Sequence, residues 1–324
     1  MKNLDPQLVW AFSGVLGLLT LSTLIGLALK LAVKKPEAQS TIRNLNARIG
    51  AWWVMSGIFG LTLVIGQIGS LILFGVMSLL ALREFVTLLP TRRADHRTLF
   101  WSFFIFTPLQ YFLIGIHWYG MFAILVPVYA FLFVPTRLAI AGDTESFLER
   151  ASTIQWGLMV CVYCLSYTPA LLMLNIPGYG RSAKLMLYLV LVDQLSDVLQ
   201  YVWGKLLGKH KIAPLVSPNK TWEGFVGGVL TATLIGTALW WMTPFTPRVA
   251  ALVSLTITLM GFAGGLTMSA IKRDRGVKDY GTLIKGHGGI LDRMDSMCFA
   301  APIFFHIVRY FYARRATPYC DSGR

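Results

Sequence analysis

Acidic and basic side chains are interleaved in residues 269–296, a polar segment between two apolar stretches. Its charged residues are Lys272, Arg273, Asp274, Arg275, Lys278, Asp279, Lys285, Asp292, Arg293 and Asp295. Asp292 and Asp295 are three residues apart, so on a helix they would share one face. Two carboxylates on one face are what Mg²⁺ needs beside substrate phosphates, and the cations suit the phosphates themselves. This combination predicts phosphoryl or nucleotidyl transfer.

A glycine-rich run, Gly286-His287-Gly288-Gly289, precedes the two carboxylates. Glycine lets the backbone approach a ligand closely, and neighbouring backbone N–H groups bind anions. Anchoring to a membrane surface alone requires neither these glycines nor four acids among the cations. The run therefore favours a ligand-binding loop.

A second polar region begins with two carboxylates in an otherwise apolar stretch. Asp193 and Asp197 are four residues apart, so they share a helix face. A charge at the centre of a bilayer costs about 2.5–3.5 kcal/mol, so we expect both side chains near the bilayer surface, facing a polar cavity or a cation. For Asp193, pairing with a neighbouring lysine at that surface is an equally good interpretation.

The same region continues to Ser217-Pro218-Asn219-Lys220-Thr221, a short polar run typical of turns. Its hydroxyls, amide and ammonium are the groups that phosphate-binding loops use. Thr221 has an alternative role, as the N-cap of a helix that starts at Trp222.

The composition indicates which kind of secondary structure positions these polar side chains. Hydrophobic residues make up 55% of the 324 residues, charged residues 14%, and the mean hydropathy is +0.61. Soluble domains carry about 25% charged residues, so the composition argues against a soluble protein. About 20 apolar residues cross a membrane as a helix. The apolar stretches are 8–33, 52–89, 99–116, 119–135, 153–174, 184–203, 225–241, 249–268 and 297–312, of which 52–89 is expected to be split into two at 66–70. We therefore predict an all-α polytopic integral membrane protein with about nine or ten transmembrane helices.

The positive charge indicates the orientation of these helices. Lys and Arg number 29 against 15 Asp and Glu, a net charge of +14, and the Lys/Arg-rich loops all follow odd-numbered spans. By the positive-inside rule they share the cytoplasmic face, so the loops 204–224 and 269–296 can meet there. We divide the chain into N-terminal helices 1–175 and a catalytic region 176–324. The expected partners are a bilayer, a nucleotide and an acidic lipid rather than nucleic acid, and the expected location is a bacterial inner membrane.

Both polar segments resemble a known family. Residues 269–296 contain Ser-x-Ile-Lys-Arg, then Lys278-Asp279-x-Gly281, then His287-Gly288-Gly289-Ile290-x-Asp292-Arg293-Met294-Asp295, and the earlier region contains Asp197, Tyr201, Gly204, Gly208-Lys209 and Ser217-Pro218-x-Lys220-Thr221-Trp222-Glu223-Gly224. This pattern resembles the signature of the phosphatidate cytidylyltransferase (CDP-diacylglycerol synthase) family over residues 193–300. A weaker similarity upstream lies at Leu82-Arg83-Glu84-Phe85.

The resemblance implies transfer of CMP from CTP to phosphatidate, with release of pyrophosphate. The expected cofactor is Mg²⁺, and the presence of a second cation is left open. The resemblance implies catalytic roles for Asp292, Asp295, Lys272 and Lys278, and metal ligands at Asp197, Asp292 and Asp295. It implies substrate contacts for Ser217, Asn219, Lys220, Arg273, His287, Gly288, Gly289 and Arg293. A homodimer is compatible with the sequence, which does not require one.

Two departures from the family pattern indicate a divergent member. Where the family usually reads Gly-Asp-Leu-x-Glu-Ser, this chain has Gly265 and Met268 in place of the acids, and Lys285 replaces a usual Pro or Gly. These changes leave open transfer to another lipid phosphate, or a catalytically silent relative. An ion-coupled transporter that uses Asp193 and Asp197 is a further alternative.

Overall fold

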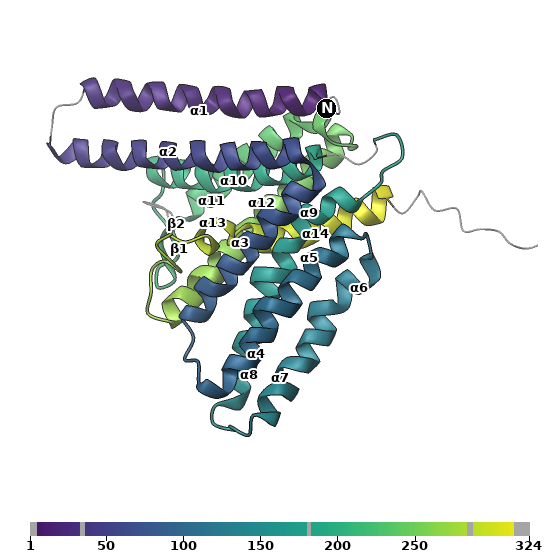
Figure 1. The fold of residues 1–324 in the computed structure, drawn as a ribbon. Helices are drawn as coiled ribbons and strands as arrows, with labels where there is room; N and C mark the ends of the chain where they lie inside the picture. Colours follow the sequence, from purple (N-terminus) through teal and green to yellow (C-terminus); the bar gives the residue numbers. More distant parts are fainter. Residues whose placement is uncertain (1–4, 33–35, 180–182, 284–287, 314–324) are drawn as a thin grey trace, which may run out of the picture.

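The computed structural model describes residues 5–32, 36–179, 183–283 and 288–313 (Figure 1). In its N-terminal half the helices are α1 Pro6–Ala32, α2 Pro36–Ile65, α3 Gln67–Thr87, η1 Arg93–Asp95, α4 His96–Trp101, η2 Ser102–Phe106, α5 Thr107–Gly115, α6 Tyr119–Ile124, η3 Leu125–Ala130, α7 Phe131–Ile140, α8 Phe147–Leu158, η4 Met159–Cys164, α9 Leu165–Ala170 and η5 Leu171–Met173. The C-terminal half contains α10 Lys184–Leu206, β1 Lys211–Ala213, β2 Ser217–Thr221, α11 Trp222–Ala238, η6 Trp240–Met242, α12 Pro247–Asp274, α13 Leu291–Met294, α14 Met297–Val308 and η7 Arg309–Ala313.

The membrane architecture predicted from composition is confirmed. Eight helical segments of the described chain are long and apolar enough to cross a membrane, and α11 and the segment Met297–Ala313 are shorter apolar helices. The apolar stretch 52–89 is divided as predicted, because α2 ends at Ile65 and α3 begins at Gln67. Gly66 between them has φ +84°, a left-handed conformation that glycine adopts without strain. The protein is an all-α polytopic integral membrane protein.

One short sheet interrupts the helices. Residues 217–221, expected as a turn, form strand β2, which pairs antiparallel with β1 in the register Lys211↔Thr221 and Ala213↔Ser217. Thr221 then caps α11, because its hydroxyl oxygen accepts a hydrogen bond from the N–H of Gly224 at 3.2 Å. The alternative role of Thr221 is therefore confirmed, and the turn expected at 217–221 is corrected to a strand that leads directly into the cap.

Glycines bring α10 and α11 into backbone contact. A Cβ added to Gly224 would lie 2.9 Å from Cα of Gly204, and one added to Gly228 would lie 2.6 Å from Cα of Gln200. Neither space accepts a larger side chain without movement of a backbone. The close packing places β2, which leads directly into α11, beside the end of α10 that carries Asp197.

An aromatic core holds α14, the helix that follows the polar segment 269–296. The rings of Phe122 (α6), Tyr167 (α9) and Phe305 (α14) are fully buried. The Tyr167 ring centroid lies 4.9 Å from that of Phe122 and 5.0 Å from that of Phe305, both in edge-to-face geometry. Such pairs contribute about 0.5–1.5 kcal/mol beyond their area burial, so they anchor the second half of α14.

A buried ion pair joins α8 to the start of α4. The Arg150 guanidinium donates to Oδ1 of Asp95 from Nε at 3.0 Å and from Nη2 at 2.6 Å. Oδ2 of Asp95 accepts from the backbone N–H of Arg92 at 2.8 Å. Arg150 is 5% exposed and Asp95 1% exposed, so this pair is shielded from water.

Replacement of Arg150 by methionine is expected to lower the free energy of unfolding by about 3–5 kcal/mol, because Asp95 would stay buried without its partner. Thermal unfolding in detergent measures the effect. The control is Arg92→Met, since Arg92 has a side chain 40% exposed and pairs with Asp143 and Glu145 at the surface. Equal melting temperatures for the two variants would contradict a stabilising role for the buried pair.

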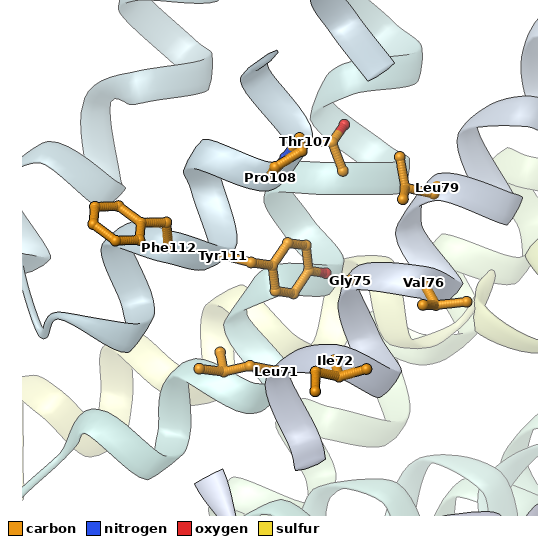
Figure 2. Close-up of a pocket in the computed structure, with 9 residues that line it drawn as sticks. All are labelled: Leu71, Ile72, Gly75, Val76, Leu79, Thr107, Pro108, Tyr111 and Phe112. Carbon is orange, nitrogen blue, oxygen red and sulfur yellow. The ribbon is translucent and has the colours of Figure 1, made fainter. Parts of the chain in front are cut away.

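A groove of about 360 Å³ runs between α3 and α5 (Figure 2). Its lining residues are Leu71, Ile72, Gly75, Val76, Leu79, Thr107, Pro108, Tyr111 and Phe112. The polar hydroxyl of Tyr111 is already bonded to the Ser78 hydroxyl at 2.6 Å. Apart from Thr107 and Tyr111 the groove is lined by apolar residues and includes no charged side chain, so it lacks the groups that phosphate chemistry requires.

Candidate active site

The two polar segments meet where α10, β2, the end of α12 and α13 come together. The guanidinium of Arg273 donates from Nε to the carbonyl oxygen of Val216 at 3.1 Å, which links the loops directly. Deeper in the site, Nζ of Lys220 lies 3.2 Å from the position that a Cβ on Gly265 would take. The prediction that the loops 204–224 and 269–296 meet is confirmed.

Asp292 is the acceptor around which the second loop is organised. Its Oδ1 accepts from Nζ of Lys272 at 2.9 Å, and its Oδ2 accepts from the backbone N–H groups of Tyr280 at 2.8 Å and Gly289 at 2.9 Å. The residue is 8% exposed. Three donors satisfy this buried carboxylate, so Asp292 fits the task of shaping the loop better than that of an open metal ligand.

Lys272 is a buried partner of the carboxylates. Its Nζ also lies 3.9 Å from Oδ2 of Asp295 and 5.3 Å from the ring centroid of Tyr280. The residue is 8% exposed. Its charge therefore offsets the acids of the loop, and its contact with a substrate phosphate stays a prediction.

Asp295 has an oxygen available beside the loop. Its Oδ1 accepts from the backbone N–H of Ser296 at 2.9 Å, whereas in the described part of the chain Oδ2 is within 4 Å of one cation, the Lys272 ammonium at 3.9 Å. Burial raises the pKa of Asp295, and the nearby charges of Lys272 and Lys220 act in the opposite direction. A carboxylate held in this way gains from a further cation, because the cation favours its ionised form.

Lys220 extends from β2 toward the same carboxylates. Burial lowers the pKa of Lys220, and the negative charges of Asp197 and Asp295 oppose that shift. Its Nζ lies 4.5 Å from the ring centroid of Phe262 on α12. Within the described residues it makes no ion pair shorter than 4 Å, so its ammonium is available to donate hydrogen bonds to a phosphate oxygen.

Arg293 is the second cation of the site that the described residues leave without an ion pair. Its Nε is buried and has no hydrogen-bond partner in the described part of the chain. An unsatisfied buried donor costs about 1–3 kcal/mol, more when it is charged, so such an atom indicates a ligand or water that completes it. Lys220 and Arg293 thus present two cations beside Asp197 and Asp295.

The glycines of the second loop are explained by the carboxylates that approach them. Gly288 has φ +80°, and a Cβ there would lie 2.7 Å from Oδ2 of Asp292. A Cβ on Gly289 would overlap the carboxylate of Glu84. In this structure both glycines therefore make room for acidic side chains of the protein itself, and their contact with a substrate stays a prediction.

Glu84 is a residue of this site that the sequence indicated only through a weak similarity. It lies in the last turn of α3 and accepts hydrogen bonds from the backbone N–H groups of Ile290 at 3.0 Å and Leu291 at 2.9 Å. A carboxylate close to the end of an apolar span was the available signal. Its partner, 206 residues away, could be found only in three dimensions.

Most of the other residues predicted for the site lie at its edge, nearer the protein surface than the buried carboxylates. Asn219 and Lys278 are exposed, and Ser217 is partly buried at the start of β2. Arg273 is exposed and donates to the carbonyl oxygens of Val216 and Val277, so it braces the two loops. His287 lies outside the described residues.

The two positions that depart from the family pattern have distinct surroundings. Met268 is fully buried, and its carbonyl oxygen accepts from the Tyr280 hydroxyl at 2.9 Å. Gly265 leaves open space that the Lys220 ammonium approaches. With glycine at 265, α12 places no carboxylate beside Lys220 at this position, and the side chain at 268 is part of the core.

Asp193 belongs to the same group of acids. It is 1% exposed, and its Oδ2 accepts from the Ser296 hydroxyl at 2.8 Å and from the Gln194 amide at 3.3 Å. Its Oδ1 has no hydrogen-bond partner in the described residues. No lysine pairs with it there, so the alternative of a surface ion pair for Asp193 is wrong.

The donor set suits Mg²⁺, which prefers oxygen ligands and usually completes its shell with substrate phosphates and water. Asp197 and Asp295 stay the predicted ligands, and Asp193 also offers an oxygen, Oδ1, without a hydrogen-bond partner in the described residues. In the described part of the chain no group of three or more His, Cys, Asp or Glu residues is placed to hold a metal. A metal ion at these residues therefore stays a prediction.

Comparison with known proteins agrees with this chemistry. Residues 46–311 match the model of the cytidylyltransferase family. The chain is 40% identical over 271 residues to the "Uncharacterized protein YnbB" of Escherichia coli (strain K12), which covers 82% of this chain and 88% of that protein. It is 34% identical over 193 residues to the phosphatidate cytidylyltransferase of Staphylococcus aureus (strain COL), covering 57% and 74% of the two chains. It is 42% identical over 120 residues to the phosphatidate cytidylyltransferase of Staphylococcus haemolyticus (strain JCSC1435), and the alignment covers 36% of this chain and 46% of that protein.

The family match extends over both polar segments and includes Asp197, Lys220, Arg293 and Asp295. At the meeting point of the loops, the two cations that make no ion pair with the described residues and the two carboxylates are groups that a nucleotidyl transfer uses. The chain therefore belongs to the cytidylyltransferase family and is a membrane nucleotidyltransferase.

Proposed function

We propose that the protein transfers CMP from CTP to phosphatidate, giving CDP-diacylglycerol and pyrophosphate. One observation carries the proposal: Lys220 on β2 and Arg293 on α13, without ion pairs in the described residues, lie beside the carboxylates of Asp197 and Asp295. The named relatives from Staphylococcus support the choice of nucleotide and lipid, because their name states that activity.

The reaction is an in-line displacement at phosphorus. A phosphate oxygen of phosphatidate forms a bond to the α-phosphorus of CTP, and the bond from that phosphorus to the oxygen bridging to the β-phosphate breaks. Pyrophosphate leaves with the electron pair of the broken bond. Catalysis of such a step rests on positioning and on charge stabilisation rather than on a covalent intermediate.

Lys220 and Arg293 stabilise the charge that develops on the phosphate oxygens, because both are already held in the site. Asp292 and Lys272 hold the loop that carries Arg293 and Asp295 in one conformation. Asp197 and Asp295 would hold Mg²⁺. When bound, the ion neutralises phosphate charge and polarises the phosphoryl oxygens.

The basic loops support an orientation with the site facing the cytoplasm of a bacterial cell. In that orientation CTP reaches the site from water, and phosphatidate reaches it from the lipid leaflet. Surface lysines and arginines attract an acidic headgroup at about 1 kcal/mol each, which raises its local concentration.

The test uses purified protein in detergent with labelled CTP, phosphatidate and Mg²⁺, and measures label that becomes lipid-soluble. We expect lipid label and pyrophosphate in equal amounts, and loss of both when EDTA removes the metal. Absence of label with phosphatidate while CTP still binds would overturn the proposal.

A second candidate is transfer to another lipid phosphate on the same scaffold. Met268 and Gly265 favour it, because the first fills an acidic position with core packing and the second changes the surroundings of Lys220. The same assay with other phosphate-bearing lipids separates the two: label in one of them and none in phosphatidate would select the second candidate.

A further inference from the structure

The last turn of α3 reaches the loop that carries the candidate active site. Glu84 accepts one hydrogen bond with each carboxylate oxygen, from the backbone N–H of Ile290 to Oε1 at 3.0 Å and from that of Leu291 to Oε2 at 2.9 Å. These N–H groups are at the start of α13, a helix of four residues. So short a helix cannot hold itself in place, since one turn is unstable alone.

The space around the Glu84 carboxylate is kept by two glycines of the loop. A Cβ added to Gly281 would lie 2.7 Å from Oε1 of Glu84. The three atoms nearest to a Cβ added to Gly289 are the carboxyl carbon and both carboxylate oxygens of Glu84, at distances that no real contact has. Neither glycine has a positive φ, so this space, and not backbone strain, is what an alanine would violate.

The segment that Glu84 holds bears the functional groups. Arg293 lies two residues after Leu291, and Asp295 lies four residues after it. Charge-assisted hydrogen bonds of this kind are shorter and roughly twice as strong as neutral ones, so they set the position of α13 relative to α3.

We propose that Glu84 is a positioning residue of the active site, which places Arg293 and Asp295 by clamping the start of α13 to the end of α3. The N-terminal helices then contribute to catalysis as well as to anchoring. The activity measurements below rest on the proposed function, whereas the geometry of the clamp does not.

The first test compares Glu84→Gln and Glu84→Ala with the wild type. Glutamine keeps one acceptor oxygen and turns an NH₂ group toward the other N–H, and alanine removes both acceptors. We expect kcat to fall about 10–100-fold, as for other partners that orient catalytic groups, with the larger loss in alanine. A merely structural role would lower the melting temperature and yield and leave kcat per folded molecule unchanged.

Glu149→Gln is the matched control. Glu149 also connects an N-terminal helix to the second loop, through Arg275 at 3.6 Å, but its side chain is 56% exposed. Exposed pairs contribute about 0–1 kcal/mol, so kcat should be that of the wild type. Equal kcat in Glu84→Ala and Glu149→Gln would overturn the proposal.

The second test is a double-mutant cycle with Gly289→Ala, which separates positioning from general damage. Alone, Gly289→Ala should lower kcat, because its methyl group displaces the Glu84 carboxylate. In the Glu84→Ala background the methyl group has room, so it should cause no further loss, and coupling of this kind is expected only between groups in contact. Losses that multiply would overturn the proposal.

The two proposals fail in different ways. If the wild type shows no transfer to any lipid phosphate, the proposed function fails, and the same cycle is then measured on the Kd for CTP in the presence of Mg²⁺. If the wild type turns over and the Glu84 variants keep its kcat, only the clamp is overturned.

Discussion

Replacement of Asp295 by asparagine is expected to lower turnover at least about 100-fold, because loss of a carboxylate that is proposed to hold the cation should exceed the 10–100-fold effect of outer partners of a metal. Asparagine has almost the same shape and keeps an acceptor for the Ser296 N–H, which lies 2.9 Å from Oδ1. What it removes is the charge of Oδ2, which in the described residues has the Lys272 ammonium 3.9 Å away. The measurement is kcat together with the Mg²⁺ concentration that gives half-maximal rate, which should rise.

Asp274→Asn is the control for Asp295→Asn. Asp274 lies at the end of α12 in the same loop region, but its side chain is 71% exposed and pairs with Arg275. Its removal changes the net charge of the protein by the same amount without touching the site. Near-normal turnover in Asp295→Asn, or an equal loss in Asp274→Asn, would remove Asp295 from the cation site.

Replacement of Lys220 by methionine is expected to lower kcat about 10²–10³-fold, the effect of deleting one preorganised group that stabilises transition-state charge. Methionine keeps the apolar contact with Phe262 and removes the ammonium that lies 4.5 Å from that ring. Because this ammonium makes no ion pair in the described residues, its loss leaves no carboxylate newly unpaired. The effect should therefore appear in turnover and CTP binding rather than in the melting temperature.

Lys205→Met is the control for Lys220→Met. Lys205 is in the last turn of α10, is exposed, and has its ammonium 5.8 Å from the Tyr201 ring centroid. It shares the electrostatic attraction of the surface for acidic lipids but does not reach the carboxylates. Similar losses in both variants would show that general surface charge, and not the position of Lys220, supports the activity.

The sequence alone was sufficient for the membrane architecture and the family. Apolar length is a local property, because a helix satisfies its own backbone hydrogen bonds within a single segment. For that reason the spans, the break at Gly66 and the sharing of one face by the two loops could be read from the sequence. The motif around His287, Asp292 and Asp295 was long enough to identify the family, and residues 46–311 match its model.

The division of labour among the charged residues was decided only by the tertiary structure. In the sequence Lys272 and Lys220 are equivalent lysines, and Asp292 and Asp295 equivalent acids. The fold surrounds Asp292 with three donors and buries Lys272 against it, whereas it leaves Lys220 without an ion pair among the described residues and Oδ2 of Asp295 without a close donor. Which group is neutralised depends on neighbours from other elements, which spacing along the chain does not encode.

Glu84 shows the same limit over the longest separation. Its carboxylate and the N–H groups of Ile290 and Leu291 belong to segments some 200 residues apart, and nothing in either segment specifies the other. Packing of α3 against α13 creates the contact, and Gly281 and Gly289 are needed only because the carboxylate is there. Local sequence therefore determined the helices and the kind of chemistry, while long-range packing decided which side chains remain available to perform it.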